Sequence, residues 1–412
     1  MKFHEVRDLV RLTAPPLDRR ARVLAAAWTV EDFRRAARRA LPRSVFDHVD
    51  GGADEEESLR GNVEAFRRWR FVPNSLVDVS APDLRTRVLG RPVAAPLGLA
   101  PTGYTRMISP LGEPAVAAAA AAAGLPYVLS TMATTSLEDL AAATPTLDRW
   151  FQLYVWKDRT LTEQLVRRAE EAGYGVLEVA IDTAVSGHRV RDVRNGLTIP
   201  PALTLSSLVD IGTRPGYWTG VLRHDSLTFA NVSPGVEGTA GYTIEDITTQ
   251  FDATVTWDDV ARIRELWSGK LVIKGTVGPR DAVRARDLGV DGVHLSNHGG
   301  RQLDRTVAPV DLVAPVRAVV GEDFGVLVDS GVRHGADIAT AIALGADACF
   351  VGRPYLWALA AAGEDGVSRV LQLLLEQFRR TLQLLGVTSI AQLRREGCDL
   401  LVHAGSGDTP KP

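Results

Sequence analysis

Short apolar runs alternate with longer amphipathic or alanine-rich stretches from about residue 94 onward. Near-continuous apolar runs are typical of strands buried on both faces, and helical stretches between them predict parallel βαβ units. Eight such strands favour a closed (β/α)8 TIM barrel over the alternative of an open, doubly wound sheet. We expect strands at 94–98, 127–130, 150–154, 176–181, 271–274, 292–296, 325–329 and 348–351, and helices at 161–171, 258–267, 279–288 and 335–344.

The first 90 residues follow another pattern and predict a helical extension that packs on the barrel. Thr29 is a good N-cap for a helix that Leu41-Pro42 ends. The basic run 34–39 in this helix is interpreted as a solvated face rather than a nucleic-acid or lipid patch, since an acidic run follows at 54–57. We therefore expect three parts: the extension at 1–90, the barrel at 91–390 and a C-terminal tail at 391–412.

One connection is too long for an ordinary loop of this fold. About 75 residues separate Ile181, at the end of the fourth predicted strand, from the helix near Trp257. Loops of this length are usually functional or disordered. We interpret 183–255 as an insertion that forms an active-site lid, and we expect part of it, about 205–245, to be mobile.

Composition narrows the class of protein. The chain has 412 residues, with 47 Lys and Arg against 50 Asp and Glu, so its net charge of −3 argues against nucleic-acid binding. Two cysteines, Cys349 and Cys398, exclude a disulfide framework and favour a reducing compartment. The N-terminus does not resemble a signal peptide, and no apolar stretch is long enough to span a membrane. We expect a cytoplasmic protein, and peripheral membrane contact stays open.

Polar residues follow every predicted strand, and the carboxyl ends of barrel strands are where this fold places its chemistry. Any one of these residues has a plain structural explanation, but polar groups at eight strand ends together indicate a site. In chain order they are Pro101, Thr102 and Gly103; Ser130; Gln152 and Tyr154; Asp182 and Arg189; Lys274; Ser296, His298 and Arg301; Asp329, Gly331 and Arg333; Gly352 and Arg353.

The last two strand ends predict a phosphate site. Glycine lets backbone N–H groups approach a phosphate closely, and arginine donates two hydrogen bonds to its oxygens. Gly331 with Arg333, and Gly352 with Arg353, follow the seventh and eighth strands, where this fold often binds phosphate. The helix that begins near residue 335 adds its positive N-terminus.

A second group indicates acid–base chemistry on a carboxylate. A neutral His298 imidazole can take a proton near neutral pH, and Asp182 can orient the ring and stabilise its cation. Arg189 and Arg301 can hold a carboxylate and so position the adjacent carbon. Lys274 has two interpretations, a Schiff-base nucleophile or a fixed charge that stabilises an anionic cofactor. The sequence shows no cluster typical of a metal site.

Residues 296–304, Ser-Asn-His-Gly-Gly-Arg-Gln-Leu-Asp, resemble the signature of the FMN-dependent 2-hydroxy-acid oxidase and dehydrogenase family. That family includes glycolate oxidase, lactate oxidase, mandelate dehydrogenase and L-lactate dehydrogenase. The resemblance covers about residues 29–390 and includes the elements at 101–102, 151–154, 189–195, 274–275 and 352–353 in order. The stretches 191–196 and 199–204 most resemble bacterial L-lactate dehydrogenases.

The resemblance implies FMN as cofactor and a role for each strand-end residue. His298 is then the base, Arg301 and Arg189 bind the substrate carboxylate, and Tyr154 lies at its hydroxyl. Lys274 is expected beside the N1/O2 edge of the flavin, which favours its fixed-charge interpretation. The remaining expected FMN contacts are Pro101, Thr102, Gly103, Ser130, Gln152 and Ser296 for the ring, and Asp329, Gly331, Arg333, Gly352 and Arg353 for the ribityl phosphate.

Three positions depart from the family pattern. His48 stands where relatives have a carboxylate-binding tyrosine, so we expect substrate binding there to depend on pH. Ala180 replaces a threonine that contacts the flavin. Met132 replaces an aromatic residue of several members and is expected to shape the pocket for the substrate side chain. These changes favour a 2-hydroxy acid that is L-lactate-like or larger.

Other properties follow from the resemblance alone. The electron acceptor is oxygen, a quinone or a carrier protein, with Gly103 favouring a dehydrogenase over an oxidase. Relatives are often tetrameric, so we expect a homo-oligomer. An alternative is a flavin enzyme of a specialised biosynthetic pathway that oxidises an amine or another hydroxylated metabolite, or that decarboxylates oxidatively. A flavin-binding protein with a disabled site is the third hypothesis, and the complete set of His298, Arg301, Arg189 and Lys274 argues against it.

Overall fold

The computed structural model describes residues 16–197, 209–210, 212–221, 228–232, 250–397 and 399–405. Most of the segment expected to be mobile, about 205–245, lies outside these residues, as do the stretch 199–204 and Cys398. The boundaries of the three predicted parts stay predictions. Within the described residues no helix is long and apolar enough to cross a membrane.

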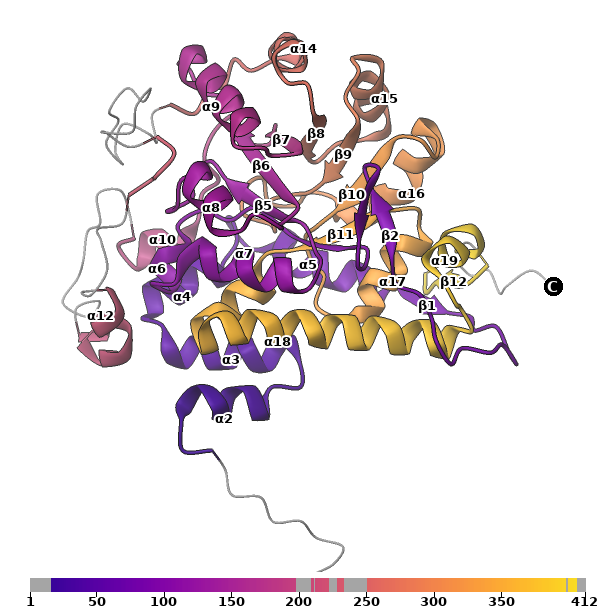
Figure 1. The fold of residues 1–412 in the computed structure, drawn as a ribbon, viewed down its shortest axis with the longest axis horizontal. Coiled ribbons are helices and arrows are strands. Elements are labelled where there is room, and N and C mark those ends of the chain that lie inside the picture. Colours follow the sequence, from indigo (N-terminus) through magenta and orange to yellow (C-terminus); the bar gives the residue numbers. More distant parts are fainter. Residues whose placement is uncertain are drawn as a thin grey trace, which may run out of the picture.

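Eight parallel strands close into a barrel, as the apolar runs predict (Figure 1). Strand β4 is hydrogen-bonded to both β5 and β11, so the first and last strands of the barrel are neighbours. The predicted strand at 94–98 begins only at Leu97, because Pro96 has no N–H to donate to a ladder. The strands are β4 (Leu97–Leu99), β5 (Tyr127–Ser130), β6 (Arg149–Tyr154), β7 (Val176–Ala180), β8 (Lys270–Gly275), β9 (Gly292–Leu295), β10 (Gly325–Val328) and β11 (Ala348–Val351).

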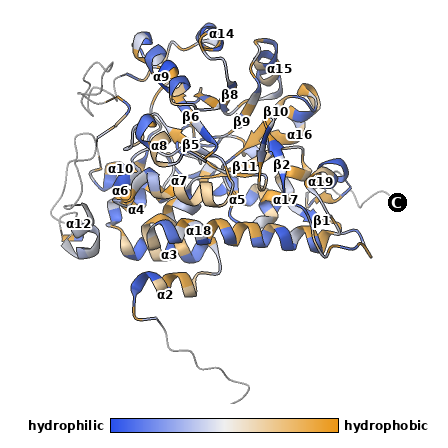
Figure 2. Cartoon of the chain, in the orientation of Figure 1, coloured by the Kyte–Doolittle hydropathy of each residue, from blue (hydrophilic) through white to orange (hydrophobic). Residues whose placement is uncertain are grey.

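Helices surround the barrel and cover its strands (Figure 1). The barrel strands are rich in buried hydrophobic residues, whereas the outer helices carry both hydrophobic and polar residues (Figure 2). The alanine-rich helix α7 is largely buried because alanine lets neighbouring helices approach closely. The helices that follow strands are α6 (Thr105–Ile108), α7 (Gly112–Ala122), α8 (Leu137–Ala143), α9 (Arg159–Glu171), α10 (Val190–Arg194), α12 (Pro215–Val221), α14 (Trp257–Leu266), α15 (Pro279–Asp287), α16 (Pro309–Val320), α17 (Gly335–Ala343) and α18 (Arg353–Leu385).

The first three N-terminal helices lie beside the long helix α18, and the fourth packs on α16 (Figure 1). They are α2 (Arg19–Ala26), α3 (Val30–Ala40), α4 (Arg43–Asp50) and α5 (Glu57–Arg67). Thr29 caps α3 with a capping box, as its position predicts. The arginines of α3 find their partners close by, Arg34 on Asp50 and Arg35 on Asp32. The acidic run 54–57 forms ion pairs with other parts of the chain, for example Glu56 with Arg191.

Two small sheets lie outside the predicted elements. The hairpin of β2 (Thr86–Val88) and β3 (Arg91–Val93) places Val88 and Val93 in one apolar cluster with Trp150 and Phe350 of the barrel strands, and so covers the amino-terminal end of the barrel. Residues 391–405, expected as a tail, include most of α19 (Ile390–Glu396) and strand β12 (Leu401–His403). Strand β12 pairs antiparallel with β1 (Trp69–Phe71), and Leu401 is buried in this pairing.

The insertion after β7 is described only in pieces. Helix α10 packs on α4, and α12 lies at the edge of the molecule, where Tyr217 donates a hydrogen bond to the Met107 carbonyl (Figure 1). Phe251, at the end of the insertion, forms a bridge with Trp156. That this insertion is a lid stays a prediction.

Candidate active site

The carboxyl ends of the barrel strands bring together the His298, Asp182 and Tyr154 side chains. The Nδ1 atom of His298 lies 3.3 Å from both carboxylate oxygens of Asp182. Its Nε2 atom lies 3.5 Å from the Tyr154 hydroxyl. Residues from β6, β7 and the turn after β9 therefore form one cluster, as their positions at strand ends predict.

The turn after β9 has an unusual backbone that presents His298. His298 itself has a φ of 57°, and Gly299 and Gly300 follow with φ of 67° and 76°. A Cβ atom on Gly300 would lie 2.6 Å from the backbone N of Leu59, so only glycine fits against helix α5. The His298 backbone N–H donates to Ser296 Oγ, which fixes the start of the turn. The strained turn and its glycines hold the imidazole over the end of the barrel.

The charges around His298 keep Asp182 ionised. Burial tends to raise the pKa of Asp182, but its interaction with His298 and the charge of Lys274 outweigh this effect, so the pKa lies below its usual value. Burial and the nearby Asp182 raise the pKa of Tyr154 to about 12, so its hydroxyl keeps its proton. Asp182 is thus an anion beside the imidazole, and Tyr154 is a hydrogen-bond donor.

Lys274 is a buried cation. Its Nζ atom lies 2.7 Å from Ser296 Oγ and 3.0 Å from the Asp329 carboxylate. Burial alone would lower the pKa of Lys274, but Asp329 and Asp182 raise it above the usual value. An ammonium that keeps its proton is a poor nucleophile, so the geometry favours the fixed-charge interpretation over the Schiff base.

Asp329 is the ion-pair partner of Lys274. Its carboxylate faces Lys274 and accepts a hydrogen bond from Ser330 Oγ at 2.7 Å. Burial tends to raise the pKa of Asp329, but Lys274, His294 and the hydrogen bonds from Ser296 and Ser330 hold it far below its usual value, so Asp329 is an anion. Asp329 is thus the counter-ion of Lys274, and its direct contact with the ribityl phosphate stays a prediction.

Arg301, His48 and Arg189 form a second cluster beside the first. The guanidinium of Arg301 lies 3.5 Å from His48 Nε2 and also donates to the His48 carbonyl. His48 Nδ1 lies 2.9 Å from Asp192, and Arg189 lies 3.8 Å from the same carboxylate. The sequence pattern did not single out Asp192 as a site residue, although its place three residues after Arg189 on a helix was an available signal.

Positive charge is in excess in this cluster. Burial and the neighbouring Arg189 and Arg353 lower the pKa of Arg301 well below its usual value. Burial and Arg301 likewise lower the pKa of His48, against the opposing effect of Asp192. The Nε atom of Arg189 is buried and has no hydrogen-bond partner within the described part of the chain. Such a cluster gains stability when an anion binds.

A third group of cations lies at the ends of β10 and β11. Burial and the nearby Arg353 lower the pKa of Arg333 to about 9, and burial and the nearby Arg191 lower the pKa of Arg353 to about 10. Arg353 donates to the carbonyls of Val49, Gly51 and Gly299, and Arg333 lies over the ring of Trp357. A Cβ atom on Gly331, which has a φ of 104°, would lie 2.2 Å from the Asn62 carbonyl oxygen. A phosphate fits this site, since it would neutralise both guanidinium groups.

The ends of β4, β5 and β6 supply neutral polar groups. Ser130 Oγ donates to Gln152 Oε1 at 3.1 Å and accepts from the Met132 N–H. Gln152 Nε2 is buried and has no partner among the described residues, so it needs an acceptor from a bound group. A Cβ on Gly103 would lie 2.9 Å from Met132 Cβ, and Thr102 lies 2.7 Å from the Tyr355 hydroxyl. These groups fit the polar edge of a flavin.

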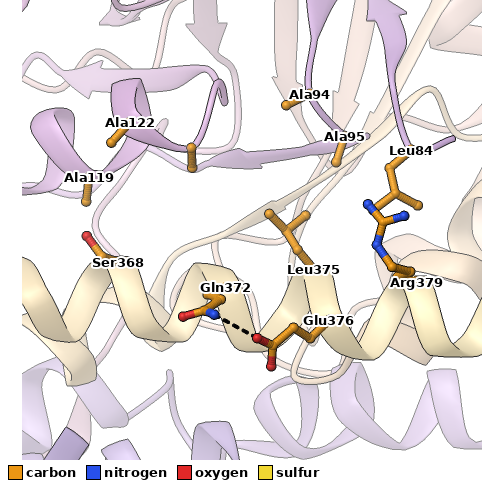
Figure 3. A pocket seen from close by; sticks show the side chains of 11 residues that line it. Leu84, Ala94, Ala95, Ala119, Ala122, Ser368, Gln372, Leu375, Glu376 and Arg379 are labelled. Atoms are coloured by element: carbon orange, nitrogen blue, oxygen red, sulfur yellow. Dashed lines mark hydrogen bonds between the residues drawn. The ribbon is translucent and has the colours of Figure 1, made fainter. Parts of the chain in front are cut away.

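Two cavities are candidates for further binding. One, of about 240 Å³, lies beside the site and is lined by residues that include Val155, Ala180 and Ile181. The other, of about 500 Å³, lies between α7 and α18, near residues that precede β4 (Figure 3). Alanine side chains form much of its wall, and Gln372 and Glu376 are hydrogen-bonded to each other there (Figure 3). None of the side chains proposed to be catalytic lines either cavity.

Comparison with known proteins identifies the family. The family described as FMN-dependent dehydrogenase matches residues 37–400. The chain belongs to this family. It is 45% identical over 394 residues to a protein of Mycobacterium tuberculosis named "Putative L-lactate dehydrogenase", covering 95% of this chain and 94% of that protein. It is 40% identical over 366 residues to (S)-mandelate dehydrogenase of Pseudomonas putida, covering 89% and 92%.

Solved structures agree with the family. The crystal structure of the monotopic membrane protein (S)-mandelate dehydrogenase matches with a TM-score of 0.86 and 39% identity, covering 92% of this chain and all of that one. A mandelate oxidase variant with (S)-mandelic acid matches with a TM-score of 0.77 and 37% identity, covering 90% and 98%. The protein is therefore an FMN-dependent oxidoreductase of the 2-hydroxy-acid dehydrogenase and oxidase family, with FMN as its cofactor. The resemblance predicted from residues 296–304 is confirmed.

Sequence reasoning missed two ionisable residues inside the barrel. Glu178 on β7 and His294 on β9 are fully buried and lie 2.9 Å apart. The available signal was a charged side chain within an otherwise apolar strand. No group of three or more metal-ligating side chains occurs in the described ranges.

Proposed function

We propose that this enzyme oxidises a 2-hydroxy acid to the 2-oxo acid with His298 as the base. The observation that carries the proposal is the imidazole held between an ionised carboxylate and a protonated tyrosine, at 3.3 Å and 3.5 Å. Its Nδ1 atom faces Asp182, so Nε2 is the nitrogen that is free to take the substrate proton. Asp182 then stabilises the imidazolium.

The neighbouring cationic cluster is proposed to hold the substrate carboxylate. Arg301 and Arg189 supply guanidinium donors, and His48 lies next to Arg301. A carboxylate bound there neutralises charge that the protein leaves in excess. It also places the substrate hydroxyl toward Tyr154 and His298, so that the α-carbon is oriented before reaction.

The other strand ends are proposed to hold FMN, which supplies a two-electron acceptor when bound. Ser130, Gln152 and the backbone at 101–103 would contact the ring system, and Ser296 would contribute through Lys274. Arg333, Arg353 and the backbone at Gly331 and Gly352 would hold the phosphate. Lys274 would offer a fixed positive charge to an anionic flavin.

The substrate is proposed to have a side chain larger than the methyl group of lactate. Met132 lies against Gly103 at the site, and an adaptable methionine leaves room where an aromatic residue would fill it. The similarity to mandelate dehydrogenase and mandelate oxidase supports a bulky side chain. A panel that runs from lactate to aromatic and long-chain 2-hydroxy acids tests this: the ratio of kcat to KM should rise with side-chain size.

Anaerobic reduction of the flavin is the decisive experiment. The purified holoenzyme should lose its yellow colour with a 2-hydroxy acid, and mass spectrometry should find the 2-oxo acid without loss of carbon dioxide. His298→Ala should keep FMN and lose reduction almost completely. A flavin that no 2-hydroxy acid reduces, or normal reduction by His298→Ala, would contradict the proposal.

Acceptor, assembly and location are proposed from the family. Reoxidation with air and with a quinone analogue separates an oxidase from a dehydrogenase, and Gly103 leads us to expect the quinone analogue to be faster. Light scattering tests the expected tetramer. Peripheral membrane contact is proposed because the similar (S)-mandelate dehydrogenase is a monotopic membrane protein. Sedimentation with vesicles tests it. A cytoplasmic location stays a prediction.

A further inference from the structure

Beneath Lys274, four ionisable side chains form a chain through the barrel interior. Lys274 Nζ lies 3.0 Å from Asp329 Oδ2, and the same oxygen lies 3.4 Å from His294 Nε2. The other ring nitrogen of His294 lies 2.9 Å from Glu178 Oε1. The side chains of His294 and Glu178 are 0% exposed. The chemistry proposed above uses Lys274 but neither of these two residues.

The geometry favours a stored proton. His294 Nδ1 lies within hydrogen-bond distance of Glu178, and Nε2 lies 3.4 Å from Asp329 with no hydrogen-bond partner among the described residues. A neutral imidazole has only one N–H, so its other nitrogen would turn a lone pair toward a carboxylate, and a second proton on His294 or on Glu178 relieves this repulsion. With the imidazolium, positive and negative groups alternate along the chain, and the two cations balance the two anions.

An apolar layer covers the Glu178–His294 pair on the side away from the active site. Val176 and Val272, two residues before Glu178 and Lys274 on the same strand faces, belong to an apolar cluster that also contains Phe350. The His294 ring lies 4.8 Å from the Phe350 ring. Buried ion pairs are costly, and this neighbouring layer shows that the same barrel also accommodates apolar side chains. Asp329 and Lys274 connect the pair to the strand ends where the flavin is expected.

We propose that Glu178 and His294 are positioning residues that set, through Asp329, the reduction potential of bound FMN. The proposal rests on the proposed place of Lys274 beside the flavin. An imidazolium next to Asp329 offsets part of its negative charge, and so leaves more of the Lys274 charge to stabilise the reduced, anionic flavin. Glu178 limits this effect, because its carboxylate lies on the far side of the imidazole.

Two single substitutions should move the potential in opposite directions. His294→Leu removes the cation and leaves the Glu178 carboxylate unbalanced, so the ratio of reduced to oxidised flavin at a fixed potential should fall at least tenfold, about 30 mV for a two-electron couple. Glu178→Gln keeps an acceptor for the Nδ1–H but removes the negative charge. At about pH 6, below the ordinary pKa of histidine, this ratio should rise at least threefold.

The potential is measured on holoenzyme equilibrated with reference dyes and without any hydroxy acid. Leu327→Val is the matched control, because Leu327 pairs with His294 in the ladder but belongs to the apolar cluster. It should leave the potential unchanged. A purely structural role would loosen the barrel in both single variants and shift their potentials the same way. Shifts of equal sign, or none beyond the control, would overturn the proposal.

The double variant Glu178→Leu, His294→Leu keeps the test decisive if a single variant does not fold. It removes both members of the buried pair and so leaves no unpaired charge in the barrel interior. We therefore expect it to fold and bind FMN. Its potential should lie below that of the wild type but above that of His294→Leu, and a wild-type value would refute the inference. An enzyme that no hydroxy acid reduces, but whose potentials shift as stated, would contradict the proposed function and support this inference.

Discussion

Replacing Asp182 with asparagine tests the proposed base directly. The substitution keeps an oxygen opposite His298 Nδ1, at the 3.3 Å position of the carboxylate, but removes its charge. A hydrogen bond to a charged partner contributes about 1.5–3 kcal/mol. If the imidazolium loses this stabilisation in the transition state, flavin reduction should slow by roughly 10- to 100-fold, since about 1.4 kcal/mol corresponds to a factor of ten.

Stopped-flow absorbance under anaerobic conditions measures this rate at saturating substrate. The substrate dissociation constant should stay close to the wild-type value, because Arg301 and Arg189 rather than Asp182 are proposed to bind the carboxylate. Asp148→Asn is the matched control: it makes the same chemical change in an ion pair with Arg91, away from the site. An unchanged reduction rate in Asp182→Asn, or a loss seen mainly in substrate affinity, would refute the reasoning.

Three further predictions concern the cations and the phosphate loop. Arg301→Ala should weaken the binding of a 2-hydroxy acid about 10- to 100-fold, from a loss of about 1.5–3 kcal/mol, as a titration of flavin absorbance measures; unchanged affinity would contradict its role. The pKa of His48 is lowered in the folded protein, so the unfolded chain binds this proton more readily and the free energy of unfolding should fall as the pH drops below about 6.5. Urea unfolding measures this free energy, and its decrease at low pH should be smaller in His48→Phe than in the wild type. An equal decrease in both proteins would contradict the role of His48. Gly331→Ala, which forces a Cβ to within 2.2 Å of the Asn62 carbonyl at a φ of 104°, should cost about 1–3 kcal/mol and weaken FMN retention on gel filtration, whereas Gly90→Ala, with open space around it, should retain FMN.

Periodicity predicted the barrel because its strands are apolar on both faces and differ sharply from the helices between them. It placed β5 and β11 at their observed bounds, and it misplaced β4 because the role of Pro96 depends on the neighbouring strand. The β2–β3 hairpin and β12 were missed since three-residue strands carry almost no periodic signal. Their pairing depends on contacts between distant segments.

The sequence predicted those site residues that lie at the ends of strands or within the family signature. His298, Asp182 and Tyr154 meet because the carboxyl ends of parallel strands share one edge. The ion pair between Asp329 and Lys274 was not predicted, because a sequence does not show which side chains face each other inside the barrel. Glu178 and His294 lie more than a hundred residues apart, and only closure of the barrel brings them into contact.

The pairing of β1 with β12 has a consequence for synthesis of the chain. Strand β1 at residues 69–71 is synthesised long before its partner at residues 401–403. Contacts between segments so distant in sequence form slowly, since a long loop must be closed first. The nascent polypeptide therefore waits, with β1 and the edge of β4 unpaired, until their partner strands β12 and β11 have been made, and this interval is when chaperones would have most to protect.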